Sequence, residues 1–589
     1  MLFRSGTCCY NPEPLAPFID LFILGEGEEV TLEYIALYRR ARDEDWTKEE
    51  LLREAARIPV LDVLIKNANI IDGTGKPAYK GSIGISGGKL VMADGSEEAT
   101  AVIDASGKYV SPGWIDAHSH GDLILGSEDA HLFKTTQGVT TELTGQCGLS
   151  MAPVMPENLA AVQNMLSMGT TWFPDDMKNW SSFARFLEYA DQQKLTANAK
   201  MYIGHSSLRI AVMGMANRPA TDAELDRMKG ILREAMEDGA AGFSTGLIYT
   251  PSCYAEEKEI IELAKVIAPF NGIYASHMRN ESDKIVEAVE ETINVGRQAG
   301  VLVDISHHKM LGKPNWGKQK QTLALMHKAR DEGIPVICDQ YPYTCNMTTL
   351  NACMPPWYFA NGFHAMTDQL KDKDFRAKLK AEMEDPATPY DNYYLNAGGW
   401  GGVYVYSASK TPEAEGHFIT EYADSIGKDP WEAFFDMCVA NNCETGGVYS
   451  SMCDEDVCEI IRDPYCIVGS DGLTRSWKEK GHPRASGTFP HVITYFVKEK
   501  KILTLEEAVN KMTGRTAEYL RIKNKGLIKE GYDADLVIFD YDKLQDTATY
   551  SNSNSITEGI DSVYVNGVLV YKDKQFTGAA PGKMLRHNA

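Results

Sequence analysis

Alternating apolar and polar positions mark the first clearly patterned segment of the chain. The alternation begins at Val60 and runs to Gly73, and shorter runs of the same kind follow at 81–86, 89–92 and 101–104. A period of two residues is typical of strands that bury one face. Glycines separate the runs as turn residues do. The pattern therefore predicts a small β-sheet or β-sandwich directly after residue 60.

The pattern changes between about residues 114 and 515, where short apolar runs alternate with helix-patterned segments. The expected strands are Thr140–Leu143, Lys200–Ile203, Gly242–Ser244, Gly272–Ala275, Leu302–Ser306, Pro335–Cys338 and Cys466–Val468. The expected helices include Ala223–Glu237, Glu256–Ala268, Asp283–Ala299 and Gln319–Glu332. Strands that alternate with helices over some 400 residues predict an α/β fold, and a (β/α)8 TIM barrel is the leading choice.

Strand patterns return after about residue 520, at Leu527-Ile528, Ala534–Phe539 and Ser562–Tyr571. We expect the two end regions, 61–113 plus 521–589, to form one discontinuous small β-sandwich domain. The barrel would then occupy 114–520, with a helical insertion around 360–437. Residues 1–60 are expected to be a separate N-terminal extension, with a charge-rich helical stretch from Glu28 to Arg57.

Composition limits the class of protein. The 589 residues exceed the size of a typical single domain, and 43% hydrophobic with 24% charged residues is a globular composition. A net charge of −23 argues against nucleic acid or an anionic membrane as a main partner. No apolar run is long enough to span a bilayer, and we expect a cytoplasmic protein whose twelve cysteines are mostly reduced.

Two histidines follow an apolar run, Val110–Ile115, that reads as a strand. His118 and His120 are two residues apart, so on a strand both imidazoles point to the same side. Imidazole is a preferred ligand of Zn²⁺ and similar metals. Such a pair alone is more often structural than metal-binding, so its meaning depends on the rest of the chain.

Further residues of ligand type stand at the ends of other predicted strands. They are Cys147, His277, His307 and Asp471. Each one alone is more often a packing or turn residue. In a (β/α)8 barrel, however, the carboxyl ends of the strands meet at the rim that carries the active site. His308, next to His307, is expected to point away by strand alternation.

The motifs around these residues resemble the N-acyl-D-amino-acid deacylase (D-aminoacylase) family of the amidohydrolase superfamily, over roughly residues 61–589. The motifs are Pro112-Gly113-Trp114-Ile115-Asp116-Ala117-His118-Ser119-His120, Gly145-Gln146-Cys147-Gly148, Tyr274-Ala275-Ser276-His277-Met278-Arg279, Ile305-Ser306-His307-His308-Lys309, Ser470-Asp471-Gly472 and His482-Pro483-Arg484. Other branches of the superfamily use a carboxylated lysine as the bridging ligand. This family has a cysteine there, and Cys147 matches that position.

The resemblance implies a role for each residue. Cys147, His277 and His307 would hold one tight zinc ion, and His118 and His120 would share Cys147 with a second, weaker divalent ion. Asp471 would be the general base and then the general acid. The expected reaction is zinc-dependent hydrolysis of the linear amide bond of an N-acyl-D-amino acid, giving a carboxylate and a free D-amino acid.

A substrate with a free α-carboxylate calls for a cation in the site. Lys309 is two residues beyond His307, on the same strand face. The resemblance adds Tyr341, in preference to Tyr343, and Arg484 as candidate substrate contacts. After Tyr343 the resembled family usually continues Thr-Ala-Ser-Ser, with a serine that helps to bind the carboxylate. This chain has Thr344-Cys345-Asn346-Met347 instead, which leaves the carboxylate contact and the substrate range open.

Three short stretches of the first 60 residues resemble the N-terminal region of radical-SAM proteins. They are 8–16, 21–29 and 46–52. The CxxxCxxC motif that binds the iron–sulfur cluster of such proteins is absent from the sequence, so radical chemistry is not implied. We interpret residues 1–60 as a fusion remnant.

Three other functions stay open on the sequence alone. One is a cyclic amide hydrolase of the dihydroorotase or hydantoinase kind, against which Cys147 argues. Another is a D-dipeptidase-like amidohydrolase. The last is a non-catalytic descendant of the fold, which would be expected to have lost ligands. Neither the oligomeric state nor the preferred side chain and acyl group follows from the sequence.

Overall fold

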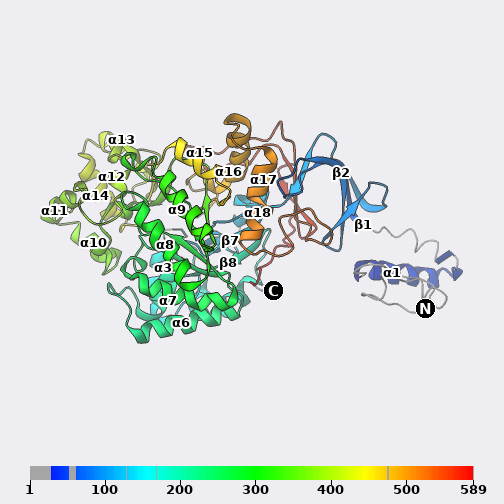
Figure 1. The fold of residues 1–589 in the computed structure, drawn as a ribbon, viewed down its shortest axis with the longest axis horizontal. Helices are drawn as coiled ribbons and strands as arrows, with labels where there is room; N and C mark the ends of the chain where they lie inside the picture. Colours follow the sequence, from blue (N-terminus) through cyan, green and yellow to red (C-terminus); the bar gives the residue numbers. More distant parts are fainter. Residues whose placement is uncertain are drawn as a thin grey trace.

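The computed structural model describes residues 28–48, 50–51, 61–127, 129–167, 169–170, 172–473 and 476–587. Its first element, α1 (Glu28–Asp43), is drawn apart from the rest of the chain in Figure 1. Within this segment, Ala41 and Leu51 are buried against Leu37 and Trp46. Most of the stretch that matches the radical-SAM resemblance, including residues 1–27 and 52–60, lies outside the described residues.

Nine parallel strands form the barrel, and two of them follow each other so closely that they act as one of its eight strands. The strands are β6 (Trp114–Asp116), β7 (Val139–Thr144), β8 (Asn198–Met201), β9 (Ile203–Gly204), β10 (Gly242–Gly246), β11 (Ile273–His277), β12 (Leu302–Ile305), β13 (Val336–Gln340) and β17 (Cys466–Val468). They pair in the orders β6-β7-β8 and β9-β10-β11-β12-β13-β17. Only Tyr202 separates β8 from β9, so the two occupy one strand position of the barrel. The backbone N–H of Ala117 donates to Val468 O at 3.1 Å and closes the ring.

Helices surround the strands (Figure 1). Those of the barrel and its loops are α3 (Leu159–Leu166), α4 (Phe183–Ala190), α5 (His205–Met213), α6 (Asp222–Glu237), α7 (Glu257–Ile267), α8 (Ile285–Ala299), α9 (Gln319–Asp331), α15 (Asp454–Arg462), α16 (Arg484–His491), α17 (Leu505–Met512) and α18 (Gly514–Tyr519). A π-helical segment, Val492–Glu499, continues α16. In α6 a capping box of Thr221 and Glu224 starts the helix, and residues such as Leu225, Met228 and Leu232 bury one face.

The barrel interior is divided between apolar and polar ends. One buried apolar cluster fills part of the ring of strands. It includes Ile115, Leu143, Ile273, Ile337 and Ile467. The carboxyl ends of the same strands carry buried polar side chains. The alternation of β and α segments predicted this architecture, and the similarity to solved (β/α)8 structures reported below confirms it.

An insertion separates β13 from β17. It holds β14 (Asn346–Thr349), α10 (Phe363–Gln369), α11 (Lys373–Glu384), α12 (Tyr393–Asn396), β15 (Val403–Ser407), α13 (Ile419–Ser425), α14 (Pro430–Ala440) and β16 (Gly446–Tyr449). The strands form a small sheet in the order β14-β16-β15. The polar helices were expected from the sequence. The sheet was not, because its strands are four or five residues long and two of them lie outside the predicted bounds of the insertion.

A second sheet joins the two ends of the chain. Its strands are β1 (Leu61–Ile70), β2 (Tyr79–Ser86), β3 (Lys89–Ala93), β4 (Ala99–Asp104), β5 (Tyr109–Pro112), β18 (Leu536–Phe539), β19 (Ile560–Val565), β20 (Val568–Lys572) and β21 (Gln575–Phe576). The antiparallel pair β5–β18 connects the early strands to the late ones. The exact domain boundaries, 61–113 and 521–589, stay a prediction.

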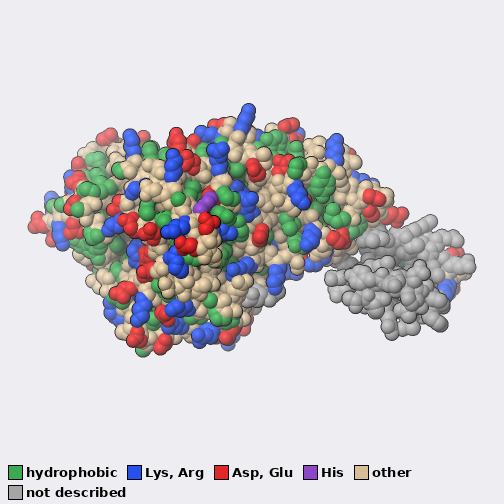
Figure 2. Space-filling model, in the orientation of Figure 1, with side chains coloured by type: hydrophobic (Ala, Val, Ile, Leu, Met, Phe, Trp, Pro, Cys, Tyr) green, Lys and Arg blue, Asp and Glu red, His purple; other side chains and the backbone are tan. Residues whose placement is uncertain are grey.

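This sheet and the insertion lie at opposite ends of the barrel in Figure 1. On the face drawn in Figure 2, acidic and basic side chains are interspersed among the described residues. Among the described residues, every helix is too short or too polar to cross a bilayer.

Candidate metal centre

Six side chains of ligand type meet at the carboxyl ends of the barrel strands. They are His118 and His120 after β6, Cys147 after β7, His277 at the end of β11, His307 after β12 and Asp471 after β17. All six are buried, and Asp471 is the most exposed at 7%. The sequence predicted these residues from their positions after apolar runs, and the fold brings all of them to one rim.

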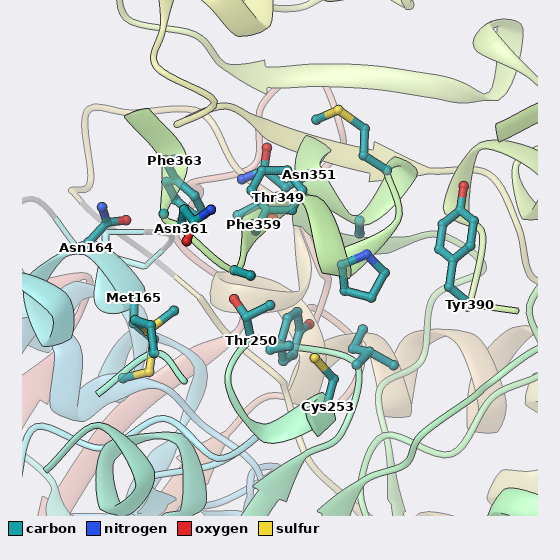
Figure 3. A pocket seen from close by; sticks show the side chains of 18 of the residues that line it. Asn164, Met165, Thr250, Cys253, Thr349, Asn351, Phe359, Asn361, Phe363 and Tyr390 are labelled. Atoms are coloured by element: carbon teal, nitrogen blue, oxygen red, sulfur yellow. The ribbon is translucent and has the colours of Figure 1, made fainter. Parts of the chain in front are cut away.

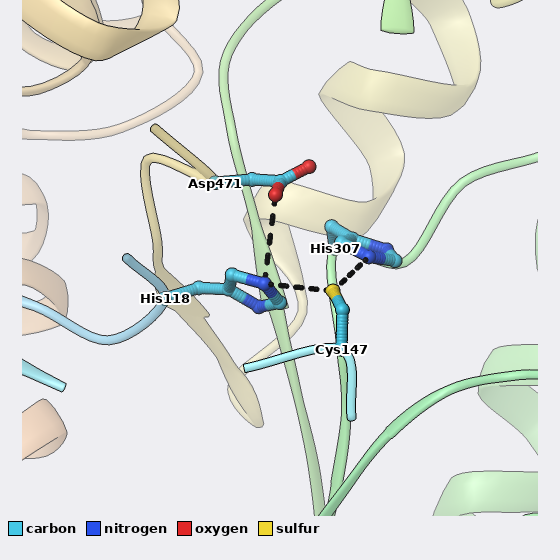
Figure 4. A group of neighbouring side chains, drawn as sticks. All are labelled: His118, Cys147, His307 and Asp471. Carbon is cyan, nitrogen blue, oxygen red and sulfur yellow. Dashed lines mark hydrogen bonds and ion pairs between the residues drawn. The ribbon is translucent and has the colours of Figure 1, made fainter. Parts of the chain in front are cut away.

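Cys147 lies at the centre of the group (Figure 4). Its Sγ is 3.4 Å from Nε2 of His118 and 3.3 Å from Nε2 of His307. Oδ1 of Asp471 is 3.6 Å from Nε2 of His118 and 3.3 Å from Nε2 of His120. The imidazoles of His277 and His307 are adjacent, with ring centroids 4.4 Å apart.

The hydrogen-bond inventory of these histidines fits a metal site. Both ring nitrogens of His277 and Nδ1 of His120 are buried and have no hydrogen-bond partner among the described residues. Buried polar atoms are seldom left unpaired, because the lost hydration is not replaced. A neutral imidazole has a lone pair on one nitrogen and an N–H on the other, so a bound cation would account for one unpaired nitrogen in each ring. A soft thiolate with several imidazoles is a donor set that zinc prefers.

Backbone geometry turns three of these side chains into the site. Cys147, His307 and Asp471 have positive φ angles of 55°, 36° and 48°. The left-handed conformation costs a non-glycine residue roughly 1–2 kcal/mol, and such strain tends to cluster at functional sites. Gly469 allows β17 to approach β6, because a Cβ atom there would lie 2.5 Å from Cβ of His118.

Two buried carboxylates orient the histidines. Oδ2 of Asp339 is 3.0 Å from Nδ1 of His118, and its Oδ1 accepts from the backbone N–H of His307 at 2.9 Å. Oε1 of Glu281 lies 3.1 Å from Nδ1 of His307. Nζ of Lys309 lies 2.6 Å from the same Nδ1, so this nitrogen of His307 faces both an ammonium and a carboxylate. For His118, the carboxylate on one ring nitrogen fixes the tautomer and leaves the other nitrogen free for a metal. Nε2 of His118 and of His307 thus face Cys147.

Sequence reasoning missed both carboxylates as functional residues. Asp339 follows the apolar start of β13, so the strand-end rule that found the other residues also applied to it. Glu281 comes four residues after His277, in a loop without regular periodicity, and the sequence pattern carries no comparable signal for it.

A second network holds β6 against β17. Oδ2 of Asp116 accepts from Nζ of Lys134 at 2.6 Å and from Oγ of Ser470 at 2.6 Å. Oδ1 of Asp116 accepts from the backbone N–H of Ser470 at 2.8 Å. Because Ser470 precedes Asp471, this network fixes Asp471 relative to His118.

The electrostatics of the site favour two anions at its centre. Burial opposes ionisation of Cys147, but His118 and His307 outweigh it and hold the pKa of the thiol well below its ordinary value. Burial likewise opposes ionisation of Asp471, but the Arg484 guanidinium and then His307 keep the pKa of this carboxyl well below its usual range. A thiolate and a carboxylate in one buried cluster require positive charge nearby.

The predicted substrate contacts border the same small cavity as the cluster. Nζ of Lys309 donates to Oε1 of Glu281 at 2.7 Å, and Nη1 of Arg484 pairs with Oδ2 of Asp471 at 2.9 Å. Cζ of Arg484 lies 4.6 Å from the ring centroid of Tyr341. Asn346 and Met347 also border this cavity.

Two neighbours of these residues point elsewhere. Nε2 of His308 is 2.8 Å from Oγ1 of Thr322 on α9, on the side of β12 away from the cluster. Tyr343 donates its hydroxyl to Asp546 at 3.2 Å. Of the two tyrosines considered, Tyr341 is therefore the one that borders the site.

The model of the amidohydrolase family matches residues 101–571. This chain belongs to that family. A second model, of the N-terminal region of radical SAM proteins, matches residues 1–63. Both resemblances recognised in the sequence are thereby confirmed.

Relatives with a described activity match almost the whole chain. It is 35% identical to a D-aminoacylase of Alcaligenes xylosoxydans xylosoxydans over 533 residues, which cover 90% of this chain and 98% of the relative. It is 32% identical to an N-acyl-D-glutamate deacylase of the same organism over 532 residues, covering 90% and 97%.

Solved structures agree with this grouping. The N-acyl-D-glutamate deacylase of Bordetella bronchiseptica, complexed with zinc and a phosphonate mimic of the tetrahedral intermediate, matches with a TM-score of 0.76 and 32% identity. The match covers 89% of this chain and 99% of that one. An L-hydantoinase from Arthrobacter aurescens matches at a TM-score of 0.53 and 16% identity, a likeness in fold alone.

Proposed function

We propose that this protein is a zinc-dependent N-acyl-D-amino-acid deacylase that hydrolyses the linear amide bond of its substrate. The products are a carboxylate and a free D-amino acid. The observation that carries the proposal is the buried group in which Cys147 lies between two imidazoles with Asp471 beside them. The preference for a D-amino acid rests on the relatives, which include a D-aminoacylase and deacylases of N-acyl-D-aspartate and N-acyl-D-glutamate.

We assign the residues of the cluster to two overlapping ligand sets. Cys147, His277 and His307 would hold the tight zinc ion, and His118 and His120 would share Cys147 with a weaker second ion. Zinc bound there would supply Lewis acidity, which polarises an amide carbonyl and lowers the pKa of water. The unpaired nitrogens of His277 and His120 support this assignment.

Asp471 is the proposed general base and acid. Arg484 holds Oδ2, while Oδ1 faces the histidines. With its pKa held low, Asp471 is a carboxylate at neutral pH and can accept a proton from the attacking water. It then donates that proton to the departing amine, which would otherwise be a poor leaving group.

Lys309, Tyr341 and Arg484 are the proposed contacts of the substrate carboxylate. Arg484 is fully buried, and its Nε has no hydrogen-bond partner among the described residues, so it retains donor capacity. The ammonium of Lys309 is partly compensated by Glu281. A carboxylate that enters this cavity therefore meets two cations, each of which already has one buried anionic partner.

The test is a panel of N-acetyl-D- and N-acetyl-L-amino acids incubated with the zinc-loaded protein. Dihydrouracil, hydantoins and D-dipeptides belong in the same panel, because they represent cyclic amidases and D-dipeptidases. We expect hydrolysis of D-enantiomers of the N-acetyl compounds, and its loss in Asp471→Asn. Hydrolysis of rings or dipeptides in preference to all acyl amino acids would overturn the proposal.

We further propose that the protein acts in the cytoplasm on small molecules, without nucleic acid or membrane partners. The acidic net charge of −23 supports this. The oligomeric state is a separate question that size-exclusion chromatography with light scattering answers directly.

A further inference from the structure

A second, much larger cavity lies between the mouth of the barrel and the insertion. Its volume is about 600 Å³, within the range of sites that enclose whole small-molecule ligands. One wall comes from α3 and residues 247–253, and the other from residues 349–364 and 389–393 (Figure 3). Apolar side chains dominate the lining, including Leu149, Met165, Ile248, Met354, Phe359 and Phe363.

This cavity begins one side chain away from the metal cluster. Leu149, Tyr249 and Tyr393 border both the large cavity and the small one that holds the cluster. The ring of Tyr249 lies 5.0 Å from that of His277, and its hydroxyl is 3.1 Å from Oγ1 of Thr348. A group attached to a carbonyl carbon at the cluster would therefore lie next to the wall that the two cavities share.

Arg279 and Asp391 on the wall already have polar partners. Arg279 pairs with Glu291 at 2.8 Å and donates to the backbone carbonyls of Cys253 and Ala255. Asp391 accepts from Oγ of Ser282 at 2.7 Å. Apolar side chains make up most of the rest of the lining, and an apolar lining favours apolar ligands.

One polar group in the wall has no partner. The side-chain amide of Asn351 is buried and unpaired among the described residues. It borders the large cavity, where it can form a hydrogen bond with a polar group or an ordered water beside an otherwise apolar occupant.

The positions of the proposed carboxylate contacts bear on which part of the substrate faces the large cavity. Lys309, Tyr341 and Arg484 border the small cavity and are not part of the lining of the large one. In an N-acyl amino acid the α-carboxylate and the side chain are both on the amine side of the scissile bond, whereas the acyl chain is on the other side. With the carboxylate at these contacts, the large cavity is open to one of the two remaining arms, the acyl chain or the side chain, and the acyl chain is the arm attached directly to the carbonyl carbon at the cluster.

We propose that the large cavity is the acyl-chain site and that the enzyme prefers apolar acyl groups much longer than acetyl. The proposal rests on the deacylase function proposed above. A methyl group would occupy only a small fraction of about 600 Å³, whereas an octanoyl or decanoyl chain would bury most of its length against the apolar wall.

The first experiment compares N-acetyl, N-butanoyl, N-octanoyl and N-dodecanoyl derivatives of the D-amino acid that the panel favours. We expect kcat/KM to rise about twofold to fourfold per added methylene until the cavity is filled, because each buried methylene adds a roughly constant increment of binding free energy. Equal kcat/KM for acetyl and octanoyl substrates would overturn the acyl-chain site while leaving the deacylase function intact. Failure to hydrolyse any of these compounds would overturn the function itself.

The second experiment narrows the cavity. Ala161→Phe adds a ring on the α3 side and Ala352→Phe adds one on the insertion side, and both alanines line the cavity. Each should lower the octanoyl-to-acetyl ratio of kcat/KM at least tenfold. Ala377→Phe, an exposed change on α11, should keep the wild-type ratio. If either narrowing variant instead changes the ratio between D-leucine and D-alanine substrates with the same acyl group, the cavity accepts the side chain and the proposal is wrong.

Discussion

Two adjoining cavities differ in their lining and in their proposed roles. We call the small one, which holds the metal cluster, the chemical region, and the large one, which is proposed to select the acyl group, the selective region. The small one, of about 20 Å³, is enclosed by buried imidazoles, a thiol and the cations of Lys309 and Arg484. The large one, of about 600 Å³, is enclosed by apolar side chains, many of them from the insertion. They share Leu149, Tyr249 and Tyr393, so the two regions are in contact yet are built from different parts of the chain.

The difference suggests how such a barrel changes substrate without changing chemistry. The residues of the small cavity are held by strand hydrogen bonds and by buried carboxylates, so each has little freedom to move. One wall of the large cavity comes from the helices and loops between β13 and β17, where substitutions leave the barrel strands untouched. The predictions below test this division, beginning with the residue on which the cluster is centred.

Cys147→Ala should have the largest effect. Removing the shared thiolate takes one ligand from the tight site and one from the weaker site. We expect loss of stoichiometric zinc, measured by atomic emission, and a fall in kcat of about a thousandfold or more, since a catalytic metal contributes several kcal/mol.

His120→Ala is the matched comparison for Cys147→Ala. His120 belongs only to the weaker ligand set, so this variant should retain the tight zinc ion and lose the second ion. If Cys147→Ala keeps both its zinc and its activity, the assignment of Cys147 as the shared ligand is wrong.

Asp471→Asn should come next. The amide is nearly the same size as the carboxylate but cannot accept the proton of the attacking water. We expect kcat to fall about 10²- to 10⁴-fold, the usual range for loss of a general acid–base. Zinc content should stay at the wild-type level, which separates this variant from Cys147→Ala. A kcat within about threefold of wild type would show that another group moves the proton.

Asp339→Asn should have a smaller effect, because Asp339 acts through His118 and His307. Loss of such an orienting carboxylate typically costs about 10- to 100-fold in metal affinity or activity. The measurement is zinc affinity by competition with a chelator, together with kcat.

Asp304→Asn is the matched control for Asp339→Asn. Asp304 is also a buried carboxyl in the barrel, but neither oxygen has a hydrogen-bond partner among the described residues. Burial, followed by the nearby charge of Asp339, raises the pKa of Asp304 well above its usual value, so it is a neutral acid. Its replacement should leave zinc affinity unchanged. Equal losses in both variants would indicate general damage to the barrel.

The sequence was informative for the chemical region for a physical reason. A parallel strand buried on both faces reads as a short apolar run, and the residue after it lies at the rim. His118, Cys147, His277, His307 and Asp471 were all found in this way. Asp339 obeys the same rule and was overlooked. Their roles in the reaction stay predictions, because position alone does not establish catalysis.

The sequence was much less informative for the selective region. Its helices were expected, but the sheet of β14, β15 and β16 was not, and the large cavity was not foreseen at all. The cavity lining comes from α3, from a loop after β10 and from the insertion, which are up to about 230 positions apart in the chain. Periodicity reports which face of an element is buried, but it does not report which elements face one another.

Asp391→Ala tests how the two regions are joined and should have the smallest effect on activity. Asp391, in the insertion, accepts from the backbone N–H of Glu281 at 2.8 Å, from Ser282 Oγ at 2.7 Å and from Asn396 Nδ2 at 2.8 Å. Its loss leaves three buried donors unpaired and should lower the free energy of unfolding by about 2–3 kcal/mol. Because Glu281 orients His307, we also expect kcat/KM to fall severalfold while zinc stays bound.

The pH dependence of this effect has a definite sign. Burial raises the pKa of Asp391 from its ordinary value of 3.8 to about 6. A carboxyl whose pKa is higher in the folded than in the unfolded state adds most to the free energy of unfolding at a pH below its unfolded-state pKa. For Asp391 that added stability is lost as the pH rises through 6. Asp391→Ala should therefore destabilise the protein more at pH 5 than at pH 8, as measured by denaturant unfolding. Asp424→Ala, an exposed change on α13 of the same insertion, controls for loss of charge. If the two variants unfold alike at both pH values, Asp391 does not join the insertion to the loop that carries Glu281, and the two regions are coupled only through the wall they share.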